Sequence, residues 1–117
     1  MKSATIISVP VTDQQRAKEF YLKLGLTLVA EAPMGKDQVW IQLGFPGGGA
    51  TITLVNWFEK MQAGSMHGLV ISTDDIEKDI EELKVKGIIV GAIDNTPWGK
   101  FATIKDPDGN SMSLHQN

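Results

Sequence analysis

The chain has 117 residues, 42% of them hydrophobic and 21% charged, which fits one soluble globular domain with a single buried core. A net charge of −3, with Lys and Arg scattered along the chain, argues against nucleic acid or a membrane surface as partner. The absence of Cys excludes disulfides and thiolate chemistry, and no apolar signal core opens the sequence, so a cytoplasmic setting is expected.

The first half of the chain predicts the element order βαβββ. Alternating apolar positions over residues 5–11 indicate a strand. A helix should follow, with Thr12 or Asp13 as its N-cap and Gly25 as its left-handed stop. Its buried stripe has helical spacing and consists of Ala17, Phe20, Tyr21 and Leu24. Three strands are expected next, at residues 26–30, 38–43 and 50–55.

The second half repeats this order. A strand is expected over residues 69–72, and then a helix opened by Asp74, with Glu77 at capping-box spacing and Gly87 at its end. Its buried stripe consists of Ile76, Ile80 and Leu83. Strands should follow at residues 88–93, 101–104 and 111–115, with a turn at 106–110. The halves align at an offset of 62 residues, the difference between positions 75 and 13, which indicates an internal repeat.

The repeat predicts an α+β fold made of two βαβββ modules, at about residues 4–57 and 66–116 of one domain over residues 1–117. Neither half can cover both faces of its own sheet. The modules are therefore expected to form a curved mixed sheet, with the helices outside and a cleft on the other face. The pattern alone leaves open a ferredoxin-like sandwich without a cleft.

Several short motifs support the first of these folds. The first helix contains Phe20-Tyr21 and ends at Leu24-Gly25, Trp98-Gly99 comes later, and Asp106-Pro107-Asp108-Gly109-Asn110 precedes the last strand. In this order they resemble the vicinal oxygen chelate superfamily of glyoxalases, bleomycin-resistance proteins and extradiol dioxygenases. The resemblance covers nearly the whole chain and implies the two-module fold with a cleft. It leaves the chemistry open, because this fold hosts many activities.

The residues that hold a metal in enzymes of this superfamily are replaced here. The resemblance places the ligands on the first and last strand of each module, where this sequence has Ile6, Thr53, Gly68 and Ser113. None of these offers an imidazole or carboxylate, so no metal and no other cofactor is expected.

The two histidines of the chain have different expected orientations. His67 has the strand parity that points away from the cleft, which favours a structural role. His115 has the parity that faces the cleft near its rim, and it is the one candidate for a general base. No carboxylate in the sequence is placed to orient it.

Strand parity also predicts which residues line the cleft. The expected ligand-binding residues are Ser8, Gln38, Trp40, Gln42, Thr53, Trp98, Phe101, Thr103 and Ser113. Aromatic walls with a few amide and hydroxyl groups suit a planar or amphipathic small molecule. The alternative is that Trp40 and Trp98 simply fill the cleft or a dimer seam.

The leading hypothesis is a metal-independent protein, similar to the bleomycin-resistance branch, that sequesters an amphipathic or aromatic compound. The alternatives are a glyoxalase-like lyase or dioxygenase-related enzyme, and an interaction domain whose cleft is filled. Relatives of this type are commonly homodimers. Trp57, Phe58 and Met61 offer apolar area at helical spacing between the modules, so a homodimer is expected.

Overall fold

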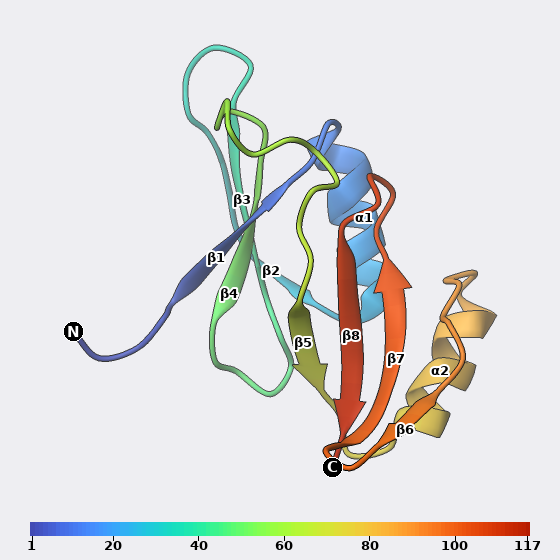
Figure 1. Cartoon of the computed structure of the whole chain (residues 1–117). Helices are drawn as coiled ribbons and strands as arrows, with labels where there is room; N and C mark the ends of the chain where they lie inside the picture. Colours follow the sequence, from blue (N-terminus) through green and yellow to red (C-terminus); the bar gives the residue numbers. More distant parts are fainter.

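The computed structural model describes residues 1–117 and contains two modules with the same element order (Figure 1). Module one consists of β1 (Ile6–Pro10), α1 (Gln14–Leu24), β2 (Thr27–Pro33), β3 (Val39–Gly44) and β4 (Thr51–Val55). Module two consists of β5 (Leu69–Ser72), α2 (Ile76–Val85), β6 (Asp94–Thr96), β7 (Gly99–Lys105) and β8 (Ser111–Gln116). The predicted α+β class and the two βαβββ modules are confirmed.

Each module forms its own four-stranded sheet. The strand orders are β1-β4-β3-β2 and β5-β8-β7-β6, so the first and last strands of each module lie side by side and run parallel. The pair Ser8 and Thr53 in module one corresponds to the pair Val70 and Ser113 in module two. The internal repeat is therefore present in the strand register. No strand of one sheet pairs with a strand of the other, so the mixed sheet of this fold is divided into two halves.

The helix ends follow from local side-chain chemistry. Asp13 caps α1 by accepting hydrogen bonds from the backbone N–H groups of Gln15 and Arg16, and Gly25 ends it with a φ of 118°. The prediction for α2 is wrong by one residue, because its N-cap is Asp75, which accepts from the Lys78 N–H.

The expected capping box of α2 does not form. The Asp75 N–H donates to the Thr73 hydroxyl, which holds Asp74 outside the helix. The carboxylate of Glu77 instead accepts a hydrogen bond of 2.7 Å from Lys100 on β7. Glu77 thus fastens α2 to its own sheet rather than closing the first helical turn.

Two predicted strands differ from the structure. β2 begins at Thr27 rather than at residue 26, because the Leu26 N–H donates to the Tyr21 carbonyl and completes the end of α1; β2 then continues to Pro33. Residues 88–93 are not a strand. Val90 forms one isolated bridge with Ile104, and regular pairing starts only at Asp94, opposite Phe101, after a one-residue change of register. The remaining strands lie within two residues of their predicted bounds.

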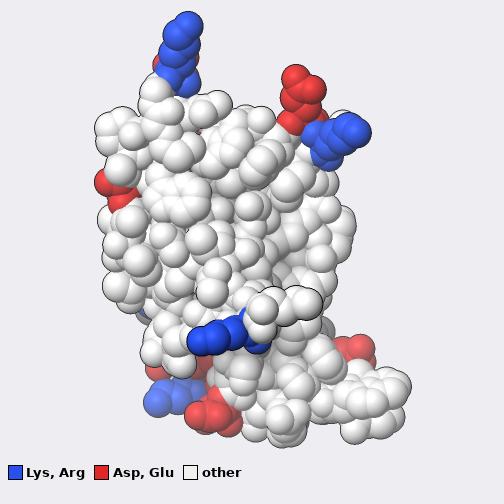
Figure 2. Space-filling model, turned by 90° about the vertical axis from the view of Figure 1, so that its left-hand side faces the viewer, with Lys and Arg blue, Asp and Glu red and all other residues white.

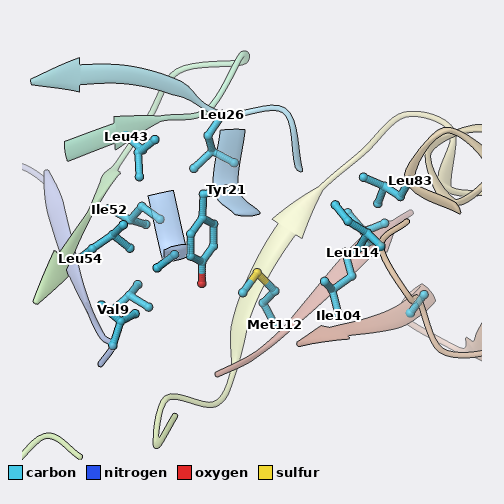
Figure 3. Packing of buried hydrophobic residues seen from close by; sticks show 14 of the residues in the cluster. Val9, Tyr21, Leu26, Leu43, Ile52, Leu54, Leu83, Ile104, Met112 and Leu114 are labelled. Atoms are coloured by element: carbon cyan, nitrogen blue, oxygen red, sulfur yellow. The ribbon is translucent and has the colours of Figure 1, made fainter. Parts of the chain in front are cut away.

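One hydrophobic cluster of 17 buried residues spans both modules, and α1 lies between them (Figure 3). One side of α1 packs on β3 and β4. On the other side, the buried hydroxyl of Tyr21 donates a hydrogen bond of 2.8 Å to Asp106, in the turn before β8. The expectation that both helices lie outside is therefore wrong for α1, because module two uses this helix as part of its own cover.

The turn at residues 106–110 joins module two to module one. The fully buried side chain of Asn110 donates to the Pro10 carbonyl at 2.7 Å and to Asp106 at 2.8 Å. Its amide oxygen accepts from the Met66 N–H at 3.0 Å. One asparagine thus connects the end of β1, the inter-module segment and the β7–β8 turn. Neither helix of the structure has the length and apolar character to cross a membrane.

Candidate ligand-binding face

Each sheet has an inner face that packs on helices and an outer face that points away from them. Along β3, Ile41 and Leu43 are fully buried on the inner face, whereas the alternate residues Trp40 and Gln42 are half-buried on the outer face. The outer face of module one carries Ser8, Trp40, Gln42, Thr51 and Thr53. The outer face of module two carries Val70, Ser72, Phe101, Thr103, Ser113 and His115.

A chain of hydrogen bonds fixes the orientation of the Trp40 indole ring in module one. The indole N–H of Trp40 donates to the Gln42 amide oxygen at 3.2 Å, and the amide nitrogen of Gln42 donates to the Thr51 hydroxyl at 2.9 Å. That hydroxyl donates in turn to the Thr5 carbonyl at 3.0 Å. In Figure 2, which shows this side of module one, charged side chains gather at the edges and the lower end. The face is therefore a broad uncharged surface with an oriented indole.

Module two holds a pair of stacked rings. Phe101 on β7 pairs with His115 on β8, and their ring centroids lie 4.4 Å apart with 25° between the planes. The His115 Nε2 atom is 2.8 Å from the carbonyl oxygen of Trp98, in the turn between β6 and β7. The Trp98 side chain is 77% exposed. Phe101 and His115 thus form a small aromatic surface on the outer face of module two, and the backbone of Trp98 borders it.

The other predicted ligand-binding residues are spread over both outer faces. Ser8 on β1 and Ser113 on β8 are half-buried, and Thr103 is exposed. Thr53 is only 1% exposed, so it offers almost no surface to a ligand. Gln38 lies in the turn before β3, where its carbonyl accepts from the Met34 N–H.

Two outer-face hydroxyls were missed by the sequence reasoning. Thr51 accepts the Gln42 hydrogen bond, and Ser72 pairs with His115 across β5 and β8. Thr51 has the same strand parity as Thr53, which was a predicted site residue. Extending the parity argument along β4 and onto β5 would have identified both.

The molecule has two cavities, and neither joins the two outer faces. The first, of about 720 Å³, lies between the modules and is lined by β5, the β3–β4 loop, α2 and the end of α1. The second, of about 700 Å³, lies between α1 and residues 87–91 and 103–107. Of the nine predicted ligand-binding residues, only Thr103 borders a cavity. No cavity of the single chain therefore contains Trp40 of module one or Phe101 of module two.

The four positions predicted to correspond to the metal ligands of the enzymes carry no metal-binding side chain. Ile6 is 44% exposed and Thr53 is buried, and neither they nor Gly68 and Ser113 carry an imidazole or carboxylate. Nowhere does the structure group three or more His, Cys, Asp or Glu side chains in a way that could hold an ion. His67 is exposed. No set of residues thus fits a metal cofactor.

Three acids with displaced pKa values lie at structural contacts. Burial, reinforced by the neighbouring Asp106 carboxylate, raises the pKa of the Tyr21 hydroxyl far above its ordinary value. The hydrogen bond from Lys18 lowers the pKa of Glu31, and that from Lys100 lowers the pKa of Glu77. These shifts mark contacts of the two helices, which are distinct from the stacked rings.

The segment between the modules is not helical, although Trp57, Phe58 and Met61 have helical spacing in the sequence. Residues 56–68 are turns and irregular chain, so the apolar residues there lack a helical face. Their exposure is as predicted: Phe58 is 48% exposed and Met61 is 37% exposed. Trp57 is half-buried and contacts Phe58, with ring centroids 6.0 Å apart.

Comparison with known families gives a match over nearly the whole chain. Residues 4–114 match the model of the Glyoxalase/Bleomycin resistance protein/Dioxygenase superfamily. The chain belongs to this superfamily. The predicted resemblance is confirmed.

Individual relatives of this superfamily member include both solved structures and a curated protein. TnmS3, an antibiotic binding protein from Streptomyces sp. CB03234, is 40% identical with a TM-score of 0.93, over 99% of this chain and 96% of that one. A glyoxalase/bleomycin resistance protein from the same organism is 42% identical with a TM-score of 0.87, over 97% and 100%. The uncharacterized protein YetH of Bacillus subtilis (strain 168) is 33% identical, over 99% of each chain.

Proposed function

We propose that this protein binds a planar aromatic or amphipathic small molecule, without a metal, on the aromatic surface of its outer faces. The observation that carries the proposal is the stacked pair of Phe101 and His115, whose imidazole is held by the backbone carbonyl of Trp98. Rigid aromatic surfaces with a few polar groups suit such ligands. The similarity to TnmS3, an antibiotic binding protein, supports an antibiotic-like compound as the ligand class.

We further propose that two copies form a homodimer in which the outer face of module one meets that of module two from the other copy. A single chain leaves both faces without a shared cavity, so binding there would bury only one side of a planar ligand. The uncharged outer face of module one, with its oriented Trp40, suits such an interface (Figure 2). Residues 1–117 would then act as one domain in each copy.

The test is ligand binding by tag-free protein, with bleomycin and daunorubicin as probes, measured by calorimetry and melting temperature. At least one probe should bind and raise the melting temperature by mass action; at 100 times the dissociation constant this is about 2.7 kcal/mol of added stability. Phe101→Leu should weaken binding, because it removes the stacking partner of His115. Val85→Ala is the matched control, since Val85 is 89% exposed on α2, remote from the rings.

The same preparation tests the two finer parts of the proposal. Light scattering should give about twice the 12.7 kDa chain mass at micromolar concentration. Elemental analysis should find no stoichiometric divalent metal, and a chelator should leave both the melting curve and probe binding unchanged. Bound zinc, nickel, manganese or iron, together with a chelator-induced drop in melting temperature, would instead favour the enzymatic branch of the superfamily.

A further inference from the structure

The ring plane and the proton position of His115 are both set by its surroundings. Stacking on Phe101 at 4.4 Å fixes the plane of the imidazole. Its Nε2 atom lies 2.8 Å from the Trp98 carbonyl oxygen, and a carbonyl can only accept a hydrogen bond. Nε2 must therefore carry the proton. In the neutral imidazole the other nitrogen, Nδ1, is then an acceptor.

The Trp98 carbonyl is itself held by the turn between β6 and β7. The Thr96 hydroxyl donates to the Gly99 carbonyl at 2.8 Å and accepts from the Trp98 N–H at 3.1 Å. Gly99 has a φ of 119°, and a Cβ there would lie 2.8 Å from the His115 Nε2 atom. The close approach of this turn to the imidazole thus depends on a glycine, which indicates that the hydrogen bond is built into the fold.

The Nδ1 atom of His115 is left free. It has no hydrogen-bond partner in the protein, and the only buried polar side-chain atom without a partner is an oxygen of Asp108, so Nδ1 is accessible to solvent. Ser72, the strand neighbour of His115, is exposed, and so is the Trp98 indole. An oriented acceptor that solvent can reach therefore lies beside the stacked rings.

We infer that His115 selects ligands that carry a neutral hydrogen-bond donor, such as a phenolic hydroxyl, on an aromatic ring placed beside the stacked rings of Phe101 and His115. The inference rests on the proposed function and specifies its ligand class. The ligand hydroxyl donates a hydrogen bond to Nδ1, while the Nε2–H group continues to donate to the Trp98 carbonyl. A ligand with an ether in place of the hydroxyl has no donor and loses this hydrogen bond. His115 is thus a specificity-determining residue.

The experiment compares 2-naphthol with 2-methoxynaphthalene, which differ in this one donor, by two-dimensional NMR titration of the full-length protein. One hydrogen bond corresponds to a preference for 2-naphthol of about threefold to tenfold in the dissociation constant. In His115→Phe, which keeps a ring in the stack, the preference should fall to about onefold, whereas Val85→Ala should retain it. The imidazole ¹⁵N resonances of the wild type should show Nε2 protonated, with Nδ1 shifting on addition of 2-naphthol only.

Each contrary result has a separate meaning. Equal affinity of the wild type for both probes overturns the role of His115 and leaves the proposed function standing. A preference for 2-naphthol that persists in His115→Phe shows that another group accepts the hydrogen bond of the ligand. An equal weakening of both probes in that variant shows that the His115 ring is only structural. Failure of both probes to shift any outer-face resonance overturns the inference and the proposed function together.

Discussion

The two modules share one strand order but differ in how completely they are covered. In module one, the inner-face residues Ile41, Ile52 and Leu54 have no exposed surface, because α1 packs directly over β3 and β4. In module two, the inner-face residues of β5, Leu69 and Ile71, are only half-buried and border the cavity between the modules. A repeated topology thus does not repeat the burial at every strand: Val9 on β1 is fully buried, whereas its counterpart Ile71 on β5 is half-buried.

The largest test of this difference is a pair of leucine truncations. Leu54→Ala should lower the free energy of unfolding by about 2–5 kcal/mol, because it leaves a cavity in a fully packed site. Leu69→Ala should cost about 1 kcal/mol, since a half-buried side chain loses less transfer free energy and its site can be filled by water. Denaturant titration with both variants measures the two losses. Equal losses would show that β5 is as well covered in solution as β4.

The next test concerns the asparagine that connects the modules. Asn110→Ala removes a side chain that hydrogen-bonds to Pro10, Met66 and Asp106, and it should cost about 2–3 kcal/mol, because buried partners are left unsatisfied. Asn95→Ala, at an exposed position in β6, is the matched control and should stay within about 0.5 kcal/mol. If both variants melt together with the wild type, the turn at 106–110 does not hold the modules together.

The smallest effect at neutral pH is expected for the single tyrosine of the chain. Tyr21→Phe should cost about 1 kcal/mol, since Asp106 still accepts from Asn110 when the hydroxyl is gone. At alkaline pH the difference in stability between the wild type and Tyr21→Phe depends on the ionisation of the tyrosine. Burial raises the pKa of Tyr21 in the folded protein, so its stabilising contribution is complete below the ordinary value of about 10 and falls as the pH rises above it.

The measurement is denaturant unfolding at several pH values above 10, together with absorbance of the tyrosinate. The wild type should lose up to about 1.4 kcal/mol more per pH unit than Tyr21→Phe. Tyrosinate absorbance should appear only as the chain unfolds, and the sequence contains no other tyrosine to obscure it. Ionisation of Tyr21 in protein that is still folded would contradict the buried contact with Asp106.

The sequence predicted the elements well where local chemistry decides them. Gly25 and Gly87 mark helix ends, and alternation predicts β1 and β5, because these signals act within a few residues. The strand predicted at residues 88–93 was wrong. Their apolar pattern suits a strand, but a change of register against β7 prevents regular pairing. The α2 cap failed because Glu77 pairs with Lys100, a partner 23 residues away that local spacing does not reveal.

The candidate site was predicted less completely than the fold. Strand parity identified Trp40 and Phe101 on the outer faces, and it is strictly local information. It could not show that no cavity joins the two outer faces, because that depends on how α1 packs between the modules. Nor could it show that His115 stacks on Phe101, since the pairing of β7 with β8 sets their register.

The tight turn at Gly99 has a consequence for altering this protein by laboratory evolution. Any larger residue there would place a Cβ 2.4 Å from the Gln116 carbonyl oxygen, a backbone atom that cannot rotate away. Position 99 should therefore stay constant in a mutant library, whereas Val70, Ser72 and Thr103 are exposed on the same face and can be varied freely. New ligand selectivity would then come from substitutions at these exposed positions, while the turn at Gly99 and the hydrogen bond between His115 and the Trp98 carbonyl stay the same.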